Sequence, residues 1–244
     1  MKTNLVITDL TRMYRGMVCI AGYDAGKRAV RPVLPPPGIP EASLMRDGKA
    51  VIFPFALVEF NLLEALPQPP HTEDVHFDPE SPRLVRAVQS REEVLGWSLF
   101  ECVEDVFGQM VLSGPGHYVL DCQGPRSLGT IQPTELLEVK YAASEEEGTW
   151  DYRLSFLDGQ NERYRLKITD LTWHYFCDSL RGGECQPQQI ADRLTEKLRA
   201  SKVYLRIGLA RGWRKFPERC YLQINGIYTF PDYLEGKTFS DLKS

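Results

Sequence analysis

The chain has 244 residues, a formal net charge of −4, 43% hydrophobic residues and 25% charged residues. These are ordinary globular proportions, and they exclude a disordered, fibrous or low-complexity protein. No apolar run approaches the roughly 20 residues of a membrane span, and the N-terminus carries no secretory pattern. We therefore expect a soluble cytoplasmic protein with no membrane partner.

Charge is unevenly distributed along the chain. Residues 1–40 carry 6 basic and 2 acidic side chains, residues 41–147 carry 7 and 19, and residues 148–244 carry 16 and 12. Binding to a polyanion depends on where positive charge lies rather than on its total. The basic ends of the chain are therefore compatible with a nucleic-acid partner, despite the negative net charge.

The cysteines occur singly, without the close pairs of a disulfide-rich or zinc-binding protein. This spacing predicts buried free thiols in a reducing compartment, and we expect no metal or other cofactor. The six are Cys19, Cys102, Cys122, Cys177, Cys185 and Cys220.

The first part of the chain predicts a β-hairpin and then an extended loop. Apolar stretches at 17–21 and 29–33 flank a polar turn at 24–27, which is a hairpin signature. The prolines of 34–40 exclude that stretch from a sheet, because proline donates no backbone hydrogen bond. A further β segment is predicted over 51–63.

The middle of the chain predicts a long loop followed by short strands. Residues 67–82 contain five prolines and no periodicity, so we expect an irregular surface loop there. The short β segments after it favour a barrel or sandwich over alternating strands and helices. They cover 98–103, 110–112, 118–121 and 136–141.

An acidic run at 142–148 is the predicted domain boundary, because it has no apolar residues to pack. The predicted domains are 1–143, a barrel with long loops, and 149–244, a barrel with a capping helix. Alternating apolar residues on both sides of Asp158-Gly159 predict a hairpin within the second domain.

The capping helix is predicted from Pro187 to about Ser201. Proline suits a first helical position, and Ile190, Leu194 and Leu198 recur four apart to form an apolar stripe. Two further β segments, near 202–209 and 220–228, are predicted on either side of a basic loop.

The pentapeptide Ile-Thr-Asp-Leu-Thr occurs twice, at 7–11 and at 168–172. Identical stretches after apolar strands suggest a duplicated unit, with the copies at equivalent strand ends of two barrels. The alternative is coincidence, because Thr and Asp commonly bond to the backbone at strand ends. Asp9 and Asp170 are interpreted as such strand-end residues rather than as catalytic groups.

Three stretches, 19–33, 168–173 and 221–231, resemble the dual-OB domain family of bacterial proteins. The resemblance implies a mostly β fold with one or two helices, arranged as two OB-like five-stranded barrels. It also implies binding of single-stranded nucleic acid or oligonucleotides, in proteins linked with bacterial defence or mobile-element conflict.

Basic residues interleaved with aromatic rings are the best candidates for nucleic-acid contacts, because cations neutralise phosphates and rings stack on bases. The segment 199–219 is richest in both, although its rings would equally suit a core and its cations a solvated rim. The full candidate set is Tyr14, Arg15, Arg28, Arg31, Arg163, Arg165, Lys167, Arg206, Arg211, Trp213, Arg214 and Lys215.

The leading hypothesis is a non-enzymatic binder of single-stranded DNA or RNA, with basic patches of the two halves lining a continuous or paired groove. No catalytic residue is assigned, because the chain has neither a nucleophile elbow nor a phosphate-cradling glycine loop. The second hypothesis is a protein-interaction adaptor that uses the acidic middle and the proline-rich loop. The third is a nucleotide-processing enzyme.

Overall fold

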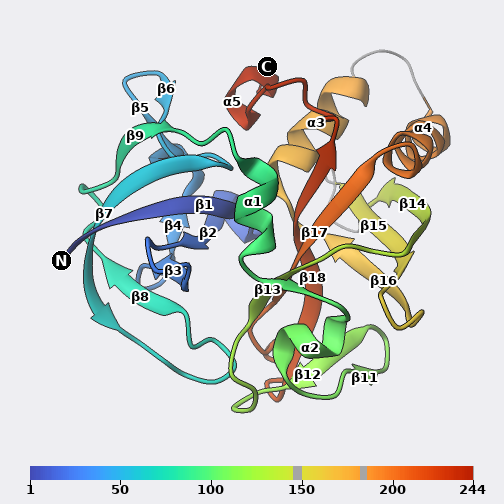
Figure 1. Cartoon of the computed structure of the whole chain (residues 1–244), viewed down its shortest axis with the longest axis horizontal. Coiled ribbons are helices and arrows are strands. Elements are labelled where there is room, and N and C mark those ends of the chain that lie inside the picture. The colour runs from blue at the N-terminus through green and yellow to red at the C-terminus, as the bar shows by residue number, and fades with distance from the viewer. Residues whose placement is uncertain (145–149, 182–185, 244) are drawn as a thin grey trace.

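Two β-barrels lie side by side in the computed structural model, which describes residues 1–144, 150–181 and 186–243 (Figure 1). The expected mostly β architecture of two OB-like barrels is confirmed. The described residues contain five α-helices rather than the expected one or two. None of the helices in these ranges is long and apolar enough to cross a membrane.

The first barrel is a closed ring of five strands. β1 pairs with β7 along its first half and with β2 along its second half, so the ring runs β1-β2-β3-β8-β7. β3 and β8 are parallel and the other neighbours are antiparallel, which is the strand order of an OB fold. The strands are β1 (Lys2–Arg12), β2 (Met17–Tyr23), β3 (Ala29–Val33), β7 (Ala56–Ala65) and β8 (Asp74–Phe77).

Shorter elements decorate this barrel. β9 (Arg83–Ala87) pairs with β7 and ends the sheet, and β4 (Ile39–Pro40) pairs with the start of β2. β5 (Met45–Arg46) and β6 (Lys49–Ala50) form a separate two-stranded hairpin. The barrel interior is filled by alternate residues of the long strands, including Leu5, Ile20, Val58 and Phe60.

The stretch expected to be an irregular loop, 67–82, contains β8, so that prediction is wrong. β8 has only four residues, and its place in the ring comes from pairing with β3 and β7, which are distant in the sequence. A strand this short leaves too little periodicity to detect. The predicted hairpin at 17–33 is confirmed as β2 and β3.

The second barrel repeats the same strand order. β14 pairs with β15, β15 with β16, β16 runs parallel to β18, and β18 pairs with β17. β13, which precedes β14, pairs with β17 and so closes the ring, as the first half of β1 does in the other barrel. The strands are β13 (Leu128–Ile131), β14 (Glu135–Ala143), β15 (Trp150–Leu157), β16 (Arg163–Ile168), β17 (Lys202–Leu209) and β18 (Arg219–Phe230).

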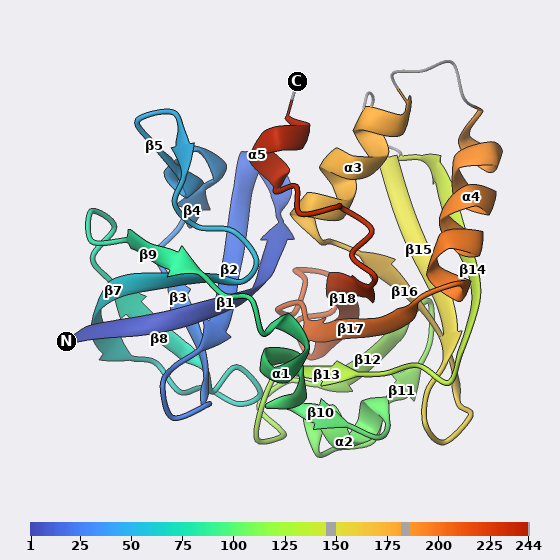
Figure 2. The ribbon, with the colours of Figure 1, turned by 45° about the horizontal axis from the view of Figure 1, so that its top comes forward.

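Two helices, α3 (Leu171–Arg181) and α4 (Pro187–Arg199), connect β16 to β17 and pack on the second barrel. The predicted helix is confirmed as α4, whose Ile190, Leu194 and Leu198 are buried. α4 runs alongside β14 (Figure 2), where the Thr195 hydroxyl accepts a hydrogen bond of 2.8 Å from the Val139 backbone N–H. This contact fixes the helix beside the sheet.

The remaining elements join the barrels or extend the second sheet. α1 (Arg91–Gly96) follows β9, and α5 (Phe239–Leu242) ends the chain. β10 (Leu99–Phe100) pairs with β13, β12 (His117–Leu120) pairs with β18, and β11 (Leu112–Ser113) pairs with β12. The β segment expected over 98–103 is strand only at β10, and α2 (Val103–Phe107) begins at its last residue.

Strands between Leu99 and Ala143 therefore pair within the second sheet, although they fall inside the first predicted domain, 1–143. The two sheets divide between β9 and β10. The acidic run was a misleading signal because it connects β14 to β15, two strands that pair with each other. Residues 145–148 of that run lie outside the described residues.

The two copies of the pentapeptide do not occupy equivalent positions, so that prediction is wrong. The first lies within β1, whereas the second spans the end of β16 and the start of α3. They nevertheless meet, since Thr11 bridges to Asp170 and the Arg12 backbone N–H donates to the Thr169 carbonyl at 2.7 Å. The copies lie at the junction of the barrels.

A buried ion pair joins the barrels near this junction. Arg206 of β17 is fully buried, and its Nη2 and Nε lie 2.8 and 3.0 Å from Oδ2 of Asp9 in β1. Its Nη1 donates to Tyr23, Ser98 and Thr130. Burial alone would lower the pKa of Arg206, but the Asp9 carboxylate keeps that pKa above its usual value. The guanidinium is charged and bonded on every side.

Replacing Arg206 should destabilise the whole chain. Arg206→Met leaves the Asp9 carboxylate buried without a counter-ion, which is expected to lower the free energy of unfolding by about 3–5 kcal/mol. Urea unfolding followed by circular dichroism measures this. Lys2→Met, which breaks the exposed pair with Glu59, is the control and should change little. If the two substitutions lowered the free energy of unfolding equally, the stabilising role of the buried Arg206–Asp9 pair would be contradicted.

Candidate nucleic-acid interface

The outer side of β16 is a row of exposed cations. Arg163, Arg165 and Lys167 are exposed and alternate with the buried Tyr164 and Leu166. This arrangement follows from the two-residue period of a strand that has one side in a core. The three cations therefore share one face of the strand.

Neighbouring strands extend this row across the barrel. Lys167 lies opposite Arg153 of β15, which lies opposite Lys140 of β14. Like charges on facing strands repel, and acidic neighbours offset this: Asp151 pairs with Arg153 at 2.9 Å and Lys167 at 3.3 Å, and Glu138 pairs with Lys140 at 3.4 Å.

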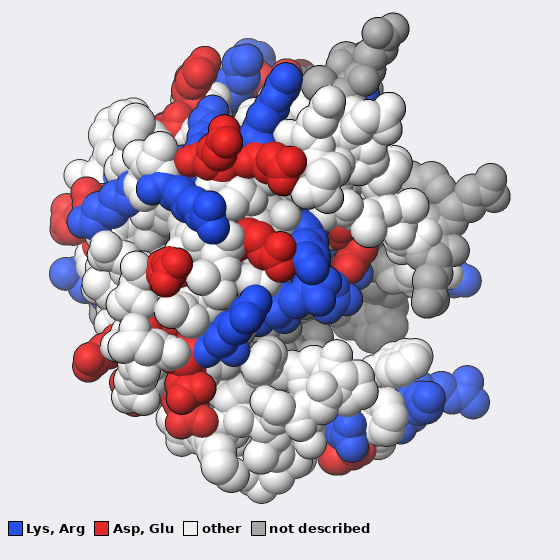
Figure 3. Space-filling model, turned by 90° about the vertical axis from the view of Figure 1, so that its right-hand side faces the viewer, with Lys and Arg blue, Asp and Glu red and all other residues white. Residues whose placement is uncertain are grey.

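Lys140, Arg153 and Lys167 thus each have an acidic partner. Arg163 and Arg165 have no ion-pair partner in the described part of the chain. Together the five cations form what we call the basic face: Lys140, Arg153, Arg163, Arg165 and Lys167. Figure 3 looks onto this side of the molecule and shows Lys and Arg side chains gathered in a band across its middle. Sequence reasoning missed Lys140, which the alternation of 138–142 would have placed here.

A groove of about 750 Å³ lies between this sheet and α4. Its sheet side includes Lys140, Arg153 and Arg165, and its helix side includes Asp192 and Glu196. We call it the α4 groove. It is open to solvent.

The loop between β17 and β18 is a second exposed basic segment. Trp213 is 61% exposed, and Arg214 and Lys215 are also exposed. Arg211 is tied back to the first barrel, because its guanidinium pairs with the buried carboxylate of Asp74 in β8. The loop is thereby anchored at its start and free at its tip.

Aromatic rings and a cation form a ladder beside this loop. The Arg219 guanidinium lies 4.3 Å from the Phe216 ring centroid and 4.8 Å from that of Tyr118, and Tyr118 lies 5.7 Å from Tyr221. Trp213 lies 6.5 Å from Phe216. These rings continue the outer side of β18 next to β16. Arg219 ends the segment 199–219 that the sequence singled out, whereas Tyr118 and Tyr221 were not sequence candidates.

The segment 199–219 does not form one surface, contrary to expectation. Arg206 is buried against Asp9 and is unavailable to a ligand. The Arg199 side chain donates to carbonyl groups of Leu136 and Leu137 beside β14, and Lys202 pairs with Glu92 of α1. Lys202 and Arg206 are four residues apart in β17 and so share one side of the strand, where acidic partners neutralise both. Apart from Arg199 and Lys202, the exposed cations of this segment lie in the loop after β17.

The N-terminal candidates are also separated. Tyr14 and Arg15 lie in the turn before β2, whereas Arg28 lies in the turn after it and pairs with Asp24 at 2.7 Å. Seven strand residues separate the two turns by roughly 20 Å. Arg31 is buried and bonds to Asp74 at 2.6 Å, so it is excluded as a surface contact.

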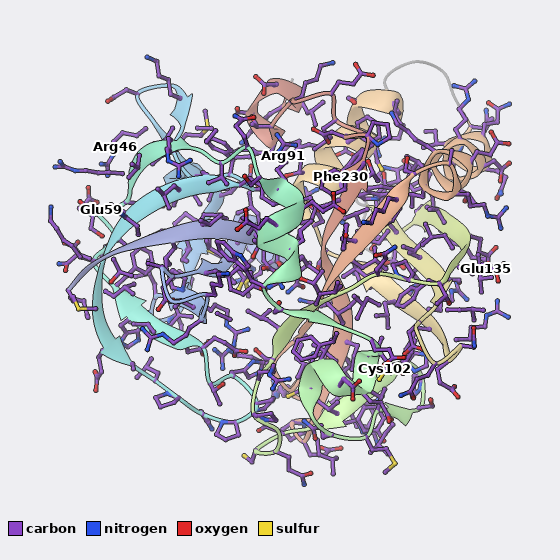
Figure 4. The ribbon with its side chains drawn as sticks, in the orientation of Figure 1. Arg46, Glu59, Arg91, Cys102, Glu135 and Phe230 are labelled. Carbon is purple, nitrogen blue, oxygen red and sulfur yellow. The ribbon has the colours of Figure 1, made fainter. Side chains whose placement is uncertain are left out.

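The outer side of β1, β2 and β3, which OB folds commonly use for binding, is covered in the first barrel. Ala21 and Tyr23 of β2 are 1% exposed, and the Tyr228 hydroxyl donates to the Thr8 carbonyl at 2.6 Å. Figure 4 labels Arg91 and Phe230 between the two barrels, where Arg91 pairs with Asp232 at 2.6 Å. Residues of the second barrel therefore cover the side of the first barrel on which OB folds commonly hold a ligand.

Asp170 follows the end of β16, as expected, whereas Asp9 lies within β1 and pairs with Arg206, so the strand-end interpretation is wrong for Asp9. Asp170 accepts hydrogen bonds from the backbone N–H groups of Thr172, Trp173 and Ile227, and so caps α3. Burial raises the pKa of Asp170 to about 7, whereas these donors act to lower it. Within residues 1–144, 150–181 and 186–243, no group of three or more metal-binding side chains is close enough to hold an ion.

The structure is that of a protein of two OB-type barrels, the second of which carries an exposed basic face. Residues 4–227 match the model of the dual OB-containing domain, and the chain belongs to that family. Comparison with curated proteins found no match.

The placement of Trp213 at the loop tip predicts a fluorescence change. Trp213→Phe should remove much of the iodide-quenchable emission, because the Trp213 ring is the most exposed large aromatic of the loop while Trp173 is fully buried. Stern–Volmer quenching measures this. Trp173→Phe is the comparison and should raise the quenchable fraction. An unchanged quenching constant in Trp213→Phe would contradict the exposed position of Trp213, because it would mean that the Trp213 ring is shielded from iodide.

Proposed function

We propose that this chain binds single-stranded nucleic acid on the outer side of its second barrel. The observation that carries the proposal is the basic face, above all Arg163 and Arg165, which are exposed and have no acidic partner among the residues that the structure describes. Exposed cations in a row neutralise successive phosphates of a backbone. The family match supports a binding role, because OB folds commonly bind nucleic acids.

The neighbouring ladder supports a single strand over a duplex. Rings such as Trp213 and Tyr221 stack on unpaired bases, and every base offers a flat face, so such contacts tolerate many sequences. Bases inside a duplex already stack on each other. Arg214 and Lys215 would add backbone contacts at the loop tip.

Affinity should fall steeply with salt. If all five cations of the basic face contact phosphates, the slope of log K against log salt concentration is about −3.5 for a single strand. Fluorescence anisotropy with a labelled 20-nucleotide oligonucleotide, titrated between low and physiological salt, measures it. Binding that is independent of salt, or absent at low salt, would contradict the proposal.

Charge reversal should identify the face. Arg163→Glu with Arg165→Glu is expected to weaken binding at least about tenfold at low salt and to make the slope shallower by about 1.4. The matched control is Arg83→Glu with Arg86→Glu, two exposed cations on β9 of the first barrel. An equal loss in both double variants would indicate general charge attraction instead of a defined face.

A further inference from the structure

The α4 groove has sides of opposite net charge. Its sheet side contains three cations of the basic face and two carboxylates, and its helix side contains two carboxylates and one cation. On the sheet side these are Lys140, Arg153 and Arg165 with Glu138 and Asp151, and on the helix side Asp192 and Glu196 with Arg199. Carboxylates beside a phosphate backbone would repel it. A nucleic-acid strand in this groove therefore has a preferred orientation, with its phosphates toward the sheet and its bases toward the helix.

The helix side is an ordered row because of its spacing. Gln188, Asp192 and Glu196 are four residues apart and lie on one face of α4, while Ile190 and Leu194 face the core. The Gln188 side chain donates to Oδ1 of Asp192 at 2.8 Å, which holds that carboxylate in place.

Glu196 is exposed and has no ion-pair partner in the described part of the chain. The bond from Val139 to Thr195 fixes α4 against the strand next to it. This hydrogen bond between β14 and α4 therefore fixes the width of the groove. Both carboxylates remain free to accept further hydrogen bonds.

We infer that the α4 groove selects bases that carry an exocyclic amino group, with Asp192 and Glu196 as the specificity-determining residues. This inference rests on the proposed function. Carboxylate oxygens accept hydrogen bonds from an amino group such as cytosine N4, and they repel a carbonyl oxygen at the same position. Cytosine-rich strands therefore bind more tightly than uracil-rich strands.

Deoxycytidine and deoxyuridine 12-mers test this directly. Cytosine has an amino group at position 4 and no hydrogen on N3, whereas uracil has a carbonyl group at position 4 and a hydrogen on N3. The wild-type chain is expected to bind the deoxycytidine oligomer at least about fivefold more tightly in an anisotropy titration. Asp192→Asn with Glu196→Gln should tighten deoxyuridine binding and bring the affinity ratio close to one, because amides donate as well as accept.

The control is Glu64→Gln with Glu93→Gln, which removes two exposed carboxylates outside the groove and should leave the ratio unchanged. Equal wild-type affinities for the two oligomers, or a ratio that survives the Asp192 and Glu196 substitutions, would overturn the inference while leaving nucleic-acid binding intact. Absence of binding to either oligomer at low salt would instead refute the proposed function.

Discussion

The buried pair of Arg206 and Asp9 is the interaction on which the arrangement of the barrels depends. A guanidinium removed from water is tolerated only where its charge and its N–H groups all find partners. Those partners come from β1 and β2 of the first barrel and from residues 98 and 130, near or in the second sheet. Shifting one barrel against the other would break several of these bonds at once.

This constraint makes the two barrels unequal. They share one strand order, yet the outer side of β1 to β3 is covered by β17, β18 and the α1 region, whereas the outer side of β14 to β16 faces solvent. The first barrel therefore acts as a support. It also anchors the β17–β18 loop through Asp74 and Arg211, so the aromatic ladder depends on both barrels. The sequence suggested a continuous or paired groove lined by basic patches of both halves; in the part of the chain that the structure describes, the candidates of the first half are separated or buried and do not continue the basic face.

Local patterns predicted the elements whose cause is local. The hairpin of β15 and β16 follows from strict alternation around Asp158-Gly159, and α4 follows from Pro187 and an apolar stripe; both were correct. The cations of β16 were found for the same reason. Features that depend on distant partners were missed. β8 is a strand because β3 and β7 lie on either side of it, and Arg206 is buried because Asp9, 197 residues away, meets it.

The repeated pentapeptide illustrates the same limit. The same five residues form strand in one place and a strand end with a helix cap in the other, because the surroundings decide which groups bond to the Asp. Composition likewise could not reveal that the acidic run at 142–148 connects β14 to β15, which pair with each other, and does not separate two domains. Identity of short segments is weak evidence of equivalent position when each segment fits a common strand-end chemistry.

We propose that nucleic acid binds the exposed outer side of β14 to β16 and not the covered outer side of the first barrel. Photo-crosslinking of the full chain to an oligonucleotide containing 4-thiothymidine, followed by mass spectrometry of the linked peptides, tests it most directly. Cross-links are predicted in 135–143, 150–157, 163–168 and 211–221. Cross-links concentrated in 17–33, on the covered side of the first barrel, would contradict the account.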